Sequence, residues 1–223
     1  MKIFSKVATL STAAIALALS ASAHAWVYTT SAQYGSWSGG GYTVYNDIWS
    51  GEGDQSLYVN SGSNWELISN AMTGGGVKAY GNSSYFPNYK NLNSACTSSF
   101  NGSSNASAYD MSYDMWSQGD VDEIMLWEKW TSNVGPIGSE IASNVSVGGS
   151  TWNIYRGNTG HNVVSLLRTS QTNSGTNNIQ AIMQYLSSKG WLSSASLYQV
   201  AFGYEITDAS NAESYTSSFS VTL

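Results

Sequence analysis

Short runs of alternating apolar and polar residues fill most of the chain after residue 25, and Gly, Asn and Ser separate them. A period of two is typical of β-strands that bury one face, and many short strands divided by turn residues indicate a β-sandwich or barrel. We therefore predict an all-β fold. The runs that predict its strands are 41–49, 55–67, 76–80, 107–116, 123–130, 140–154, 161–169, 198–207 and 214–223.

One segment, residues 178–191, has a different period. Its large apolar residues recur at the spacing of one helix face, and Gly190 is placed to end a helix in the left-handed conformation. The pattern predicts one α-helix packed on the outside of the sheets. The residues of this apolar stripe are Ile179, Ile182, Met183, Leu186 and Trp191.

Two neighbouring runs place acidic residues on one side of a predicted sheet. In the run Glu-Ile-Met-Leu-Trp at 123–127, the Glu shares a face with the Met and the Trp, while the Ile and the Leu form the apolar face. In the run before it, Asp114 shares a face with Asp110, Ser112 and Trp116. Carboxylates therefore stand where a strand would normally carry uncharged residues.

A hairpin through residues 117–120 would make Asp114 and Glu123 neighbours on one sheet face, where like charges raise one of the two pKa values. Solvated strand residues are the alternative, because charged side chains mostly lie in water. A carboxylate flanked by aromatic and Met side chains is partly desolvated, and such surroundings adapt carboxyls to acid–base or nucleophilic chemistry. We therefore treat Asp114 and Glu123 as candidate catalytic residues.

The first 25 residues have the pattern of a secretory signal. Lys2 and Lys6 give a basic start, 7–19 is largely apolar, and Ala23-His24-Ala25 is a small-x-small cleavage site. The apolar run is too short for a membrane span, and no later run approaches that length. We expect residues 26–223 to form a single exported catalytic domain, free of the membrane after signal removal and monomeric.

The composition favours sugar over nucleic acid as a partner. The net charge is −6, which disfavours nucleic-acid binding. Aromatic residues make up 13% of the chain and charged residues 10%, with nine Trp and fifteen Tyr. Planar rings together with neutral Asn, Ser and Thr suit stacking on sugar rings and hydrogen bonding to hydroxyls, although a purely structural use of the aromatics is the alternative.

Cysteine and histidine are too scarce for several common chemistries. Cys96 is the sole cysteine, so an intrachain disulfide is excluded, and the Thr and Ser residues after it do not activate a thiol. His161 is the only histidine after the predicted signal, too few for a His-based metal site or a Ser-His-Asp triad. We predict no metal and no cofactor.

A second carboxylate of interest occurs near the end of the chain. In residues 199–207, one face carries Phe, Tyr and Ile, and Glu205 lies on the other face with Gly203 and Thr207. Two outward glutamates on separate strands of an aromatic-rich exported β protein match the requirement for glycoside cleavage, in which one carboxylate attacks the sugar carbon and the other protonates the leaving oxygen. The competing acids are expected to be solvated at strand ends or turns; they are Glu128, Glu140 and Glu213.

Five segments, in the order that a known family has them, carry a resemblance to the family 12 glycoside hydrolases, which are secreted endo-β-1,4-glucanases and xyloglucanases. Residues 123–127 and Gly-Pro-Ile-Gly at 135–138 resemble the nucleophile strand and its loop. Asn-Asp-Ile-Trp at 46–49 resembles the early Asn-x-x-Trp segment that lines the substrate cleft. Tyr-Asp-Met-Trp at 113–116 resembles the strand whose Asp assists the nucleophile, and Gly-Tyr-Glu at 203–205 resembles the acid/base segment.

The resemblance implies a β-jelly roll of two antiparallel sheets, with a concave substrate cleft and one helix on the convex side. It implies a retaining endo-acting enzyme that cleaves β-1,4-glucosidic bonds of cellulose-like glucans, mixed-linkage glucans or xyloglucan. Glu123 is then the nucleophile, Glu205 the acid/base and Asp114 the supporting residue. The residues expected to bind the β-glucan are Asn46, Trp49, Trp116, Met125, Trp127 and Pro136.

Two alternatives remain open at this point. A β-1,4-xylanase on the related jelly roll would also use two glutamates. A non-catalytic, lectin-like carbohydrate-binding domain would share the fold class, because fold does not settle function, but it would not need two facing acids.

Overall fold

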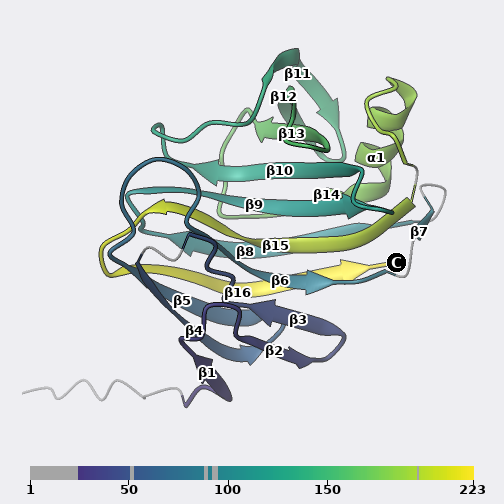
Figure 1. Cartoon of the computed structure of the whole chain (residues 1–223). Helices are drawn as coiled ribbons and strands as arrows, with labels where there is room; N and C mark the ends of the chain where they lie inside the picture. Colours follow the sequence, from purple (N-terminus) through teal and green to yellow (C-terminus); the bar gives the residue numbers. More distant parts are fainter. Residues whose placement is uncertain (1–24, 51–52, 88–89, 92–94, 195) are drawn as a thin grey trace, which may run out of the picture.

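Two β-sheets pack face to face in the computed structural model, which describes residues 25–50, 53–87, 90–91, 95–194 and 196–223 (Figure 1). The predicted signal lies outside the described residues except for its last residue, Ala25. Within them the smaller sheet has six strands, in the order β1 (Tyr28–Thr30), β4 (Asp54–Ser61), β5 (Asn64–Asn70), β16 (Ala212–Thr222), β8 (Thr97–Ser104) and β14 (Ser174–Asn178).

The larger sheet contains ten of the described strands. β7 (Lys90–Asn91) pairs with one end of β15 and lies off the main path. The path runs in the order β11 (Ser139–Val147), β12 (Ser150–Asn158), β13 (Asn162–Arg168), β10 (Asp122–Trp130), β9 (Ala108–Ser117), β15 (Ser196–Asp208), β6 (Ala79–Tyr85), β3 (Tyr42–Tyr45) and β2 (Ser36–Gly39). Among the described strand pairs, β10 with β13 is parallel and the rest are antiparallel.

Aromatic side chains join the two sheets in the core. Tyr113 of β9 meets the edge of Phe100 with ring centroids 5.8 Å apart, and Phe202 of β15 stacks on Phe219 at 5.7 Å. Each aromatic side chain buries roughly 150–250 Å² and so contributes much of the hydrophobic stabilisation. The apolar faces predicted for β9, β10 and β15 therefore point to the core, and their other faces point away from the smaller sheet.

The predicted helix is present and shorter than its apolar stripe. Helix α1 (Ile179–Ser188) begins after Asn178, whose side-chain Oδ1 accepts a hydrogen bond of 2.9 Å from the Ala181 N–H. It ends where Gly190 takes a φ of +68°. Its buried face contacts β8 and β11. In the part of the chain that the structure describes, no helix has the length and apolar character of a membrane span.

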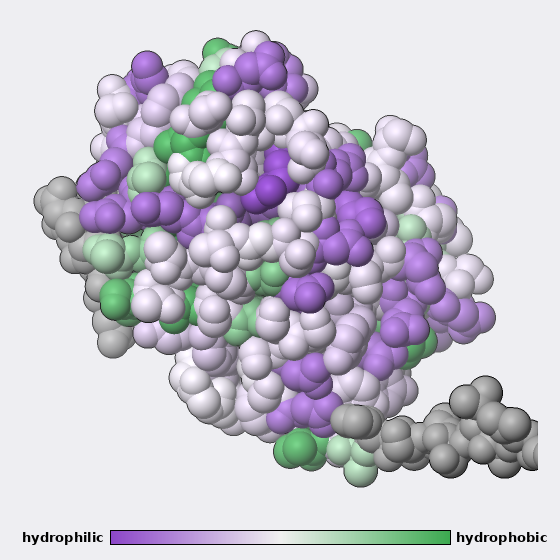
Figure 2. Space-filling model, turned by 180° about the vertical axis from the view of Figure 1, so that it is seen from behind, coloured by the Kyte–Doolittle hydropathy of each residue, from purple (hydrophilic) through white to green (hydrophobic). Residues whose placement is uncertain are grey.

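The structure confirms the all-β prediction, but two of the predicted runs each divide into two strands, and five described strands, β1, β2, β7, β8 and β14, lie outside the predicted runs. Runs 55–67 and 140–154 each form a hairpin of two strands. β8 and β14 are rich in Ser, Asn and Gly, which carry no apolar alternation. On the face shown in Figure 2, hydrophobic residues form small separate groups among hydrophilic ones, so this face presents no broad apolar surface.

Candidate active site

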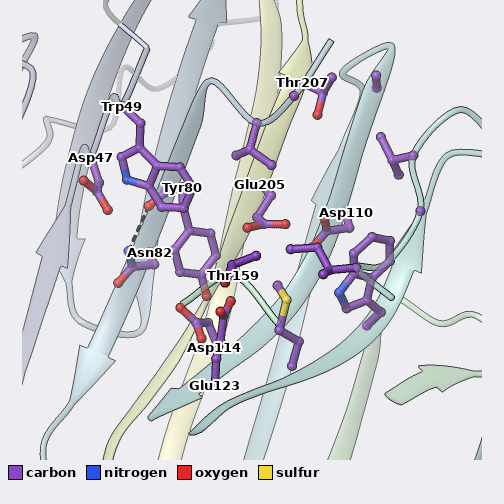
Figure 3. Close-up of a pocket in the computed structure, with 18 of the residues that line it drawn as sticks. Asp47, Trp49, Tyr80, Asn82, Asp110, Asp114, Glu123, Thr159, Glu205 and Thr207 are labelled. Carbon is purple, nitrogen blue, oxygen red and sulfur yellow. Dashed lines mark hydrogen bonds between the residues drawn. The ribbon is translucent and has the colours of Figure 1, made fainter. Parts of the chain in front are cut away.

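A cavity of about 860 Å³ lies over the outward face of the larger sheet. Its lining residues come from β6, β9, β10 and β15 and from the loops around residues 47–49, 74–77, 133–137 and 159–161. Figure 3 shows the carboxyl groups of Asp114, Glu123 and Glu205 turned toward one region of this cavity. The structure thus brings together the three residues that the sequence predicted to be catalytic.

Register explains how β9 and β10 present their acids. The predicted hairpin is present, and Trp116 lies opposite Glu123 while Asp114 lies opposite Met125. Asp114 and Glu123 are therefore diagonal neighbours on one face, within reach of one another's side chains. Asp120, with a φ of +54°, lies in the turn that joins the two strands.

Asp114 is held by an indole. Its Oδ2 accepts a hydrogen bond of 3.0 Å from Trp116 Nε1, while its Oδ1 is buried and has no hydrogen-bond partner among the described residues. Burial raises the pKa of Asp114 well above its ordinary value, and the charge of Glu123 raises it further. Asp114 therefore tends to hold a proton beside Glu123, as a coupled pair of carboxyls requires.

Glu205 lies beside another buried acid, Asp110. The two residues are directly opposite in the pairing of β15 with β9, and their side chains are hydrogen-bonded to one another. Asp110 is 2% exposed, and Ser112 Oγ donates a hydrogen bond of 2.6 Å to its Oδ1. Burial raises the pKa of Glu205 well above its ordinary value and Asp110 adds to this, while burial raises the pKa of Asp110 to about 6. These surroundings favour a protonated Glu205.

Glu123 has a different neighbour, the imidazole of His161. His161 Nε2 lies 2.6 Å from Glu123 Oε2, and the imidazole ring packs against Trp116 with centroids 4.8 Å apart. Nothing in the sequence around His161 pointed to this contact, because it depends on the pairing of β13 with β10. Glu123 and Glu205 therefore share one cavity in unlike surroundings.

Four of the six predicted sugar-binding residues line the cavity: Trp49, Trp116, Met125 and Trp127. Trp49 is 47% exposed and available for stacking, and its ring lies 6.5 Å from that of Tyr80. Trp127 is 3% exposed and packs edge-on against Trp130, so its ring is less available for stacking than that of Trp49.

The structure corrects two of the substrate-binding predictions. Asn46 is fully buried and donates hydrogen bonds to the carbonyl oxygens of Ala32 and Gln55, so its side chain supports the fold; its neighbour Asp47 lines the cavity. Pro136 is half-buried and does not line the cavity, whereas the residues on either side of it do. In both segments a residue adjacent to the predicted one lines the cavity.

Other lining residues were missed by the sequence reasoning. Asp110 shared the predicted face of Asp114, and that alternation was the signal that could have identified it. Tyr80 and Asn82 of β6 face the same cavity, and Asn82 Nδ2 donates a 2.8 Å hydrogen bond to the Tyr80 carbonyl oxygen (Figure 3). The predicted run 76–80 ended before Asn82, and Tyr80, at its end, was not singled out among the many tyrosines of the chain.

Glu128 was expected to be solvated, and this was wrong. It is fully buried between the sheets, with Arg168 Nε 2.6 Å from its Oε2 and Asn177 Nδ2 donating a 2.6 Å hydrogen bond to its Oε1. It belongs to a structural ion pair outside the cavity. Among the described residues, no group of three or more His, Cys, Asp or Glu side chains could hold a metal ion.

Comparison with known proteins gives the family. The model of Glycosyl hydrolase family 12 matches residues 20–223. The probable xyloglucan-specific endo-beta-1,4-glucanase A of Aspergillus terreus is 33% identical over 215 residues, covering 86% of this chain and 86% of that protein. Endoglucanase S of Pectobacterium parmentieri is 30% identical over 204 residues, covering 74% of this chain and 75% of that protein.

Solved structures agree. The xyloglucanase domain of NopAA, a type three effector from Sinorhizobium fredii in complex with cellobiose, is 35% identical with a TM-score of 0.83, covering 88% of this chain and 98% of that chain. The family 12 xyloglucanase from Bacillus licheniformis is 28% identical with a TM-score of 0.78, covering 87% and 99%. The fold and the carboxyl-lined cavity are those of a glycoside hydrolase. The chain belongs to glycosyl hydrolase family 12, which confirms the resemblance and the jelly-roll prediction and does not favour the lectin or xylanase alternatives.

Proposed function

We propose that the protein is a retaining endo-β-1,4-glucanase in which Glu123 is the nucleophile and Glu205 the general acid and base. The observation that carries this assignment is the unlike surroundings of two glutamates in one cavity. Where two titratable groups have surroundings that separate their proton affinities, the acid and base roles follow. Burial and Asp110 keep the pKa of Glu205 high, which supports the role of proton donor.

The chemistry follows the double-displacement route. Glu205 gives its proton to the glycosidic oxygen while a carboxylate oxygen of Glu123 attacks the anomeric carbon, and the bond to the leaving sugar breaks. Glu205, now ionised, takes a proton from a water molecule that attacks the same carbon and releases Glu123. Asp114 lies diagonal to Glu123, so it supports the nucleophile without bonding to the sugar.

The substrate that we propose is a β-1,4-linked glucan backbone, with xyloglucan as the first candidate. Relatives in Aspergillus terreus and Emericella nidulans are named xyloglucan-specific endo-beta-1,4-glucanases, and the Sinorhizobium fredii domain was solved with cellobiose. The exposed ring of Trp49 at the cavity wall suits stacking on a glucosyl unit.

Side-by-side hydrolysis tests the substrate class. We expect reducing-sugar release from xyloglucan, lichenan or carboxymethylcellulose, with an early fall in viscosity because an endo-acting enzyme cuts inside the chain. Xylan should be a poor substrate. Release from xylan alone would favour the xylanase alternative, and binding without hydrolysis would favour a lectin-like protein.

Product stereochemistry tests the mechanism separately. Proton NMR of the first product should show the β-anomer, since two displacements restore the original configuration. An early α-anomer would contradict the nucleophile assignment. In the Glu205→Ala variant, turnover should fall least on aryl glycosides with good leaving groups, and added azide should give a β-glycosyl azide.

We also propose that residues 1–25 direct export and that residues 26–223 form the catalytic unit. The basic start, the apolar run and the Ala-His-Ala site support this. Expression of the full chain in a bacterial host, followed by N-terminal sequencing of the exported protein, should give Trp26 as the first residue. A product that keeps Met1 would contradict it.

A further inference from the structure

The path of the chain brings His161 to Glu123. β13 runs parallel to β10, with Asn162 opposite Asp122 and Val163 opposite Glu123. Two parallel strands begin at the same edge of a sheet, so the residue just before β13 lies beside the first residues of β10. His161 is that residue.

The backbone around His161 is held in place on both sides. Asn162 N–H donates to the Val121 carbonyl oxygen at 3.1 Å, and Asn162 Nδ2 donates to Asp122 Oδ1 at 2.8 Å. On the other side, Thr159 N–H donates to the carbonyl oxygen of His161 at 3.1 Å. Asp122 is itself fixed by the backbone N–H groups of residues 193 and 194. The loop is therefore a defined support.

The imidazole of His161 makes a short polar contact with the carboxylate of Glu123. Its Nε2 lies 2.6 Å from Glu123 Oε2, a short nitrogen–oxygen hydrogen-bond distance, and 3.3 Å from Thr159 Oγ1. The Trp116 ring packs against the imidazole, and Trp116 Nε1 donates its hydrogen bond to Asp114. The Nε2 contact therefore engages one oxygen of the Glu123 carboxylate, Oε2.

We propose that His161 is a positioning residue for the nucleophile: its Nε2–H donates to Glu123 Oε2 and holds the carboxylate in the orientation that attacks the anomeric carbon. This inference rests on the proposed role of Glu123. The other titratable groups facing Glu123 are Asp114 and Glu205, which are both acids, so His161 is the only basic side chain among the described residues that line the cavity. A substrate-contacting role is not required of it.

Three variants separate the hydrogen bond from ring packing. His161→Gln keeps an N–H donor at a similar reach and loses the ring, His161→Phe keeps a ring against Trp116 and loses the donor, and His161→Ala loses both. The probe is 2,4-dinitrophenyl 2-deoxy-2-fluoro-β-cellobioside, whose leaving group needs no proton from Glu205. The rate of covalent labelling at Glu123, followed by intact mass and peptide mapping, then reports the attack by Glu123 alone.

We expect labelling to be slower by roughly tenfold to a hundredfold in the Phe and Ala variants, as for loss of a hydrogen bond to a charged group, and to recover to within a few-fold of wild type in the Gln variant. The acidic limb of the pH profile should move in the Phe and Ala variants and less in the Gln variant. Thermal unfolding of all three variants provides the check on folding.

Other outcomes overturn specific claims. If the Phe variant labels as fast as wild type while the Ala variant is slow, His161 acts by packing and the positioning proposal is wrong. If all three label at the wild-type rate, the contact has no role in attack. If wild type is labelled at another residue, the proposed function of Glu123 itself fails, which distinguishes that failure from failure of this inference.

Discussion

Strand β10 carries two glutamates whose surroundings are opposite. Glu128, toward its end, is fully buried between the sheets against the guanidinium of Arg168. Glu123, at its start, is partly exposed to a cavity that it shares with Asp110, Asp114 and Glu205, and no Lys or Arg is among the described lining residues. A buried carboxylate paired with a cation is typical of a structural ion pair. Acids that lie close together without such cations repel one another when ionised, and such clusters occur mainly at functional sites.

Replacement of Glu123, the proposed nucleophile, is the strongest way to test this contrast. Glu123→Gln should lower kcat by on the order of 10⁴- to 10⁶-fold because it removes the attacking oxygen. The melting temperature should stay close to that of wild type, because the residue lies at the cavity wall. Steady-state hydrolysis of xyloglucan together with circular-dichroism melting measures both. A variant that keeps a hundredth of the activity or more, on the order of 10⁻², would contradict the assignment.

The matching change at Glu128 should have the reverse effect. Glu128→Gln leaves the Arg168 guanidinium without its carboxylate, so the free energy of unfolding should fall by about 3–5 kcal/mol, while kcat per folded molecule stays unchanged. Urea unfolding and active-site titration measure the two quantities. Glu140→Gln, at an exposed position, is the control and should change stability by about 0.5 kcal/mol or less. A lower kcat per folded molecule in Glu128→Gln would contradict the purely structural role of Glu128.

Asp114→Asn probes the coupling inside the cavity. Because its raised pKa keeps Asp114 protonated while Glu123 ionises, the amide removes the second ionisation of the pair, which occurs at higher pH, and the pH–rate profile should change on its basic side. The loss in rate should lie within or below about 10²–10⁴-fold and should be smaller than that of Glu123→Gln. If rate and pH profile are both unaffected, Asp114 plays no part in catalysis.

Asp110→Asn is expected to have the smallest effect. Burial is the main cause of the raised pKa of Glu205, and the neighbouring charge of Asp110 adds to it. Removal of that charge should lower the pKa, so Glu205 loses its proton at lower pH and the basic limb of the profile moves to lower pH. At the optimum the loss should be less than the roughly 10²-fold typical of a direct acid–base group. If the basic limb does not move, the charge of Asp110 does not contribute to the pKa of Glu205.

Alternation along β9, β10 and β15 was sufficient to predict which faces carry the acids, because side-chain direction in a strand depends only on parity. The local pattern could not predict what depends on strand partners. Asp114 lies opposite Met125, Asp110 opposite Glu205, and His161 beside Glu123, each through pairings set by the whole fold.

Glu128 and Asn46 are two polar residues whose burial the sequence pattern also could not predict. A polar residue in a strand looks solvated in sequence, yet Glu128 is buried because Arg168 and Asn177 from distant segments satisfy it. Asn46 matches a cleft motif, yet its amide is directed into the fold by Ala32 and Gln55. Burial of a polar group depends on partners that can come from distant parts of the chain.

The positions of the last two strands have a consequence for how the chain folds. β15 lies between β9 and β6, and β16 lies between β5 and β8, so the final segment occupies the interior of both sheets. A nascent chain that ends before residue 196 therefore lacks Glu205 and leaves each sheet divided into two unjoined parts. Such non-local pairing implies a high contact order and slow folding. A truncation that removes β15 and β16 should therefore abolish folding, because it removes interior strands of both sheets and not edge strands.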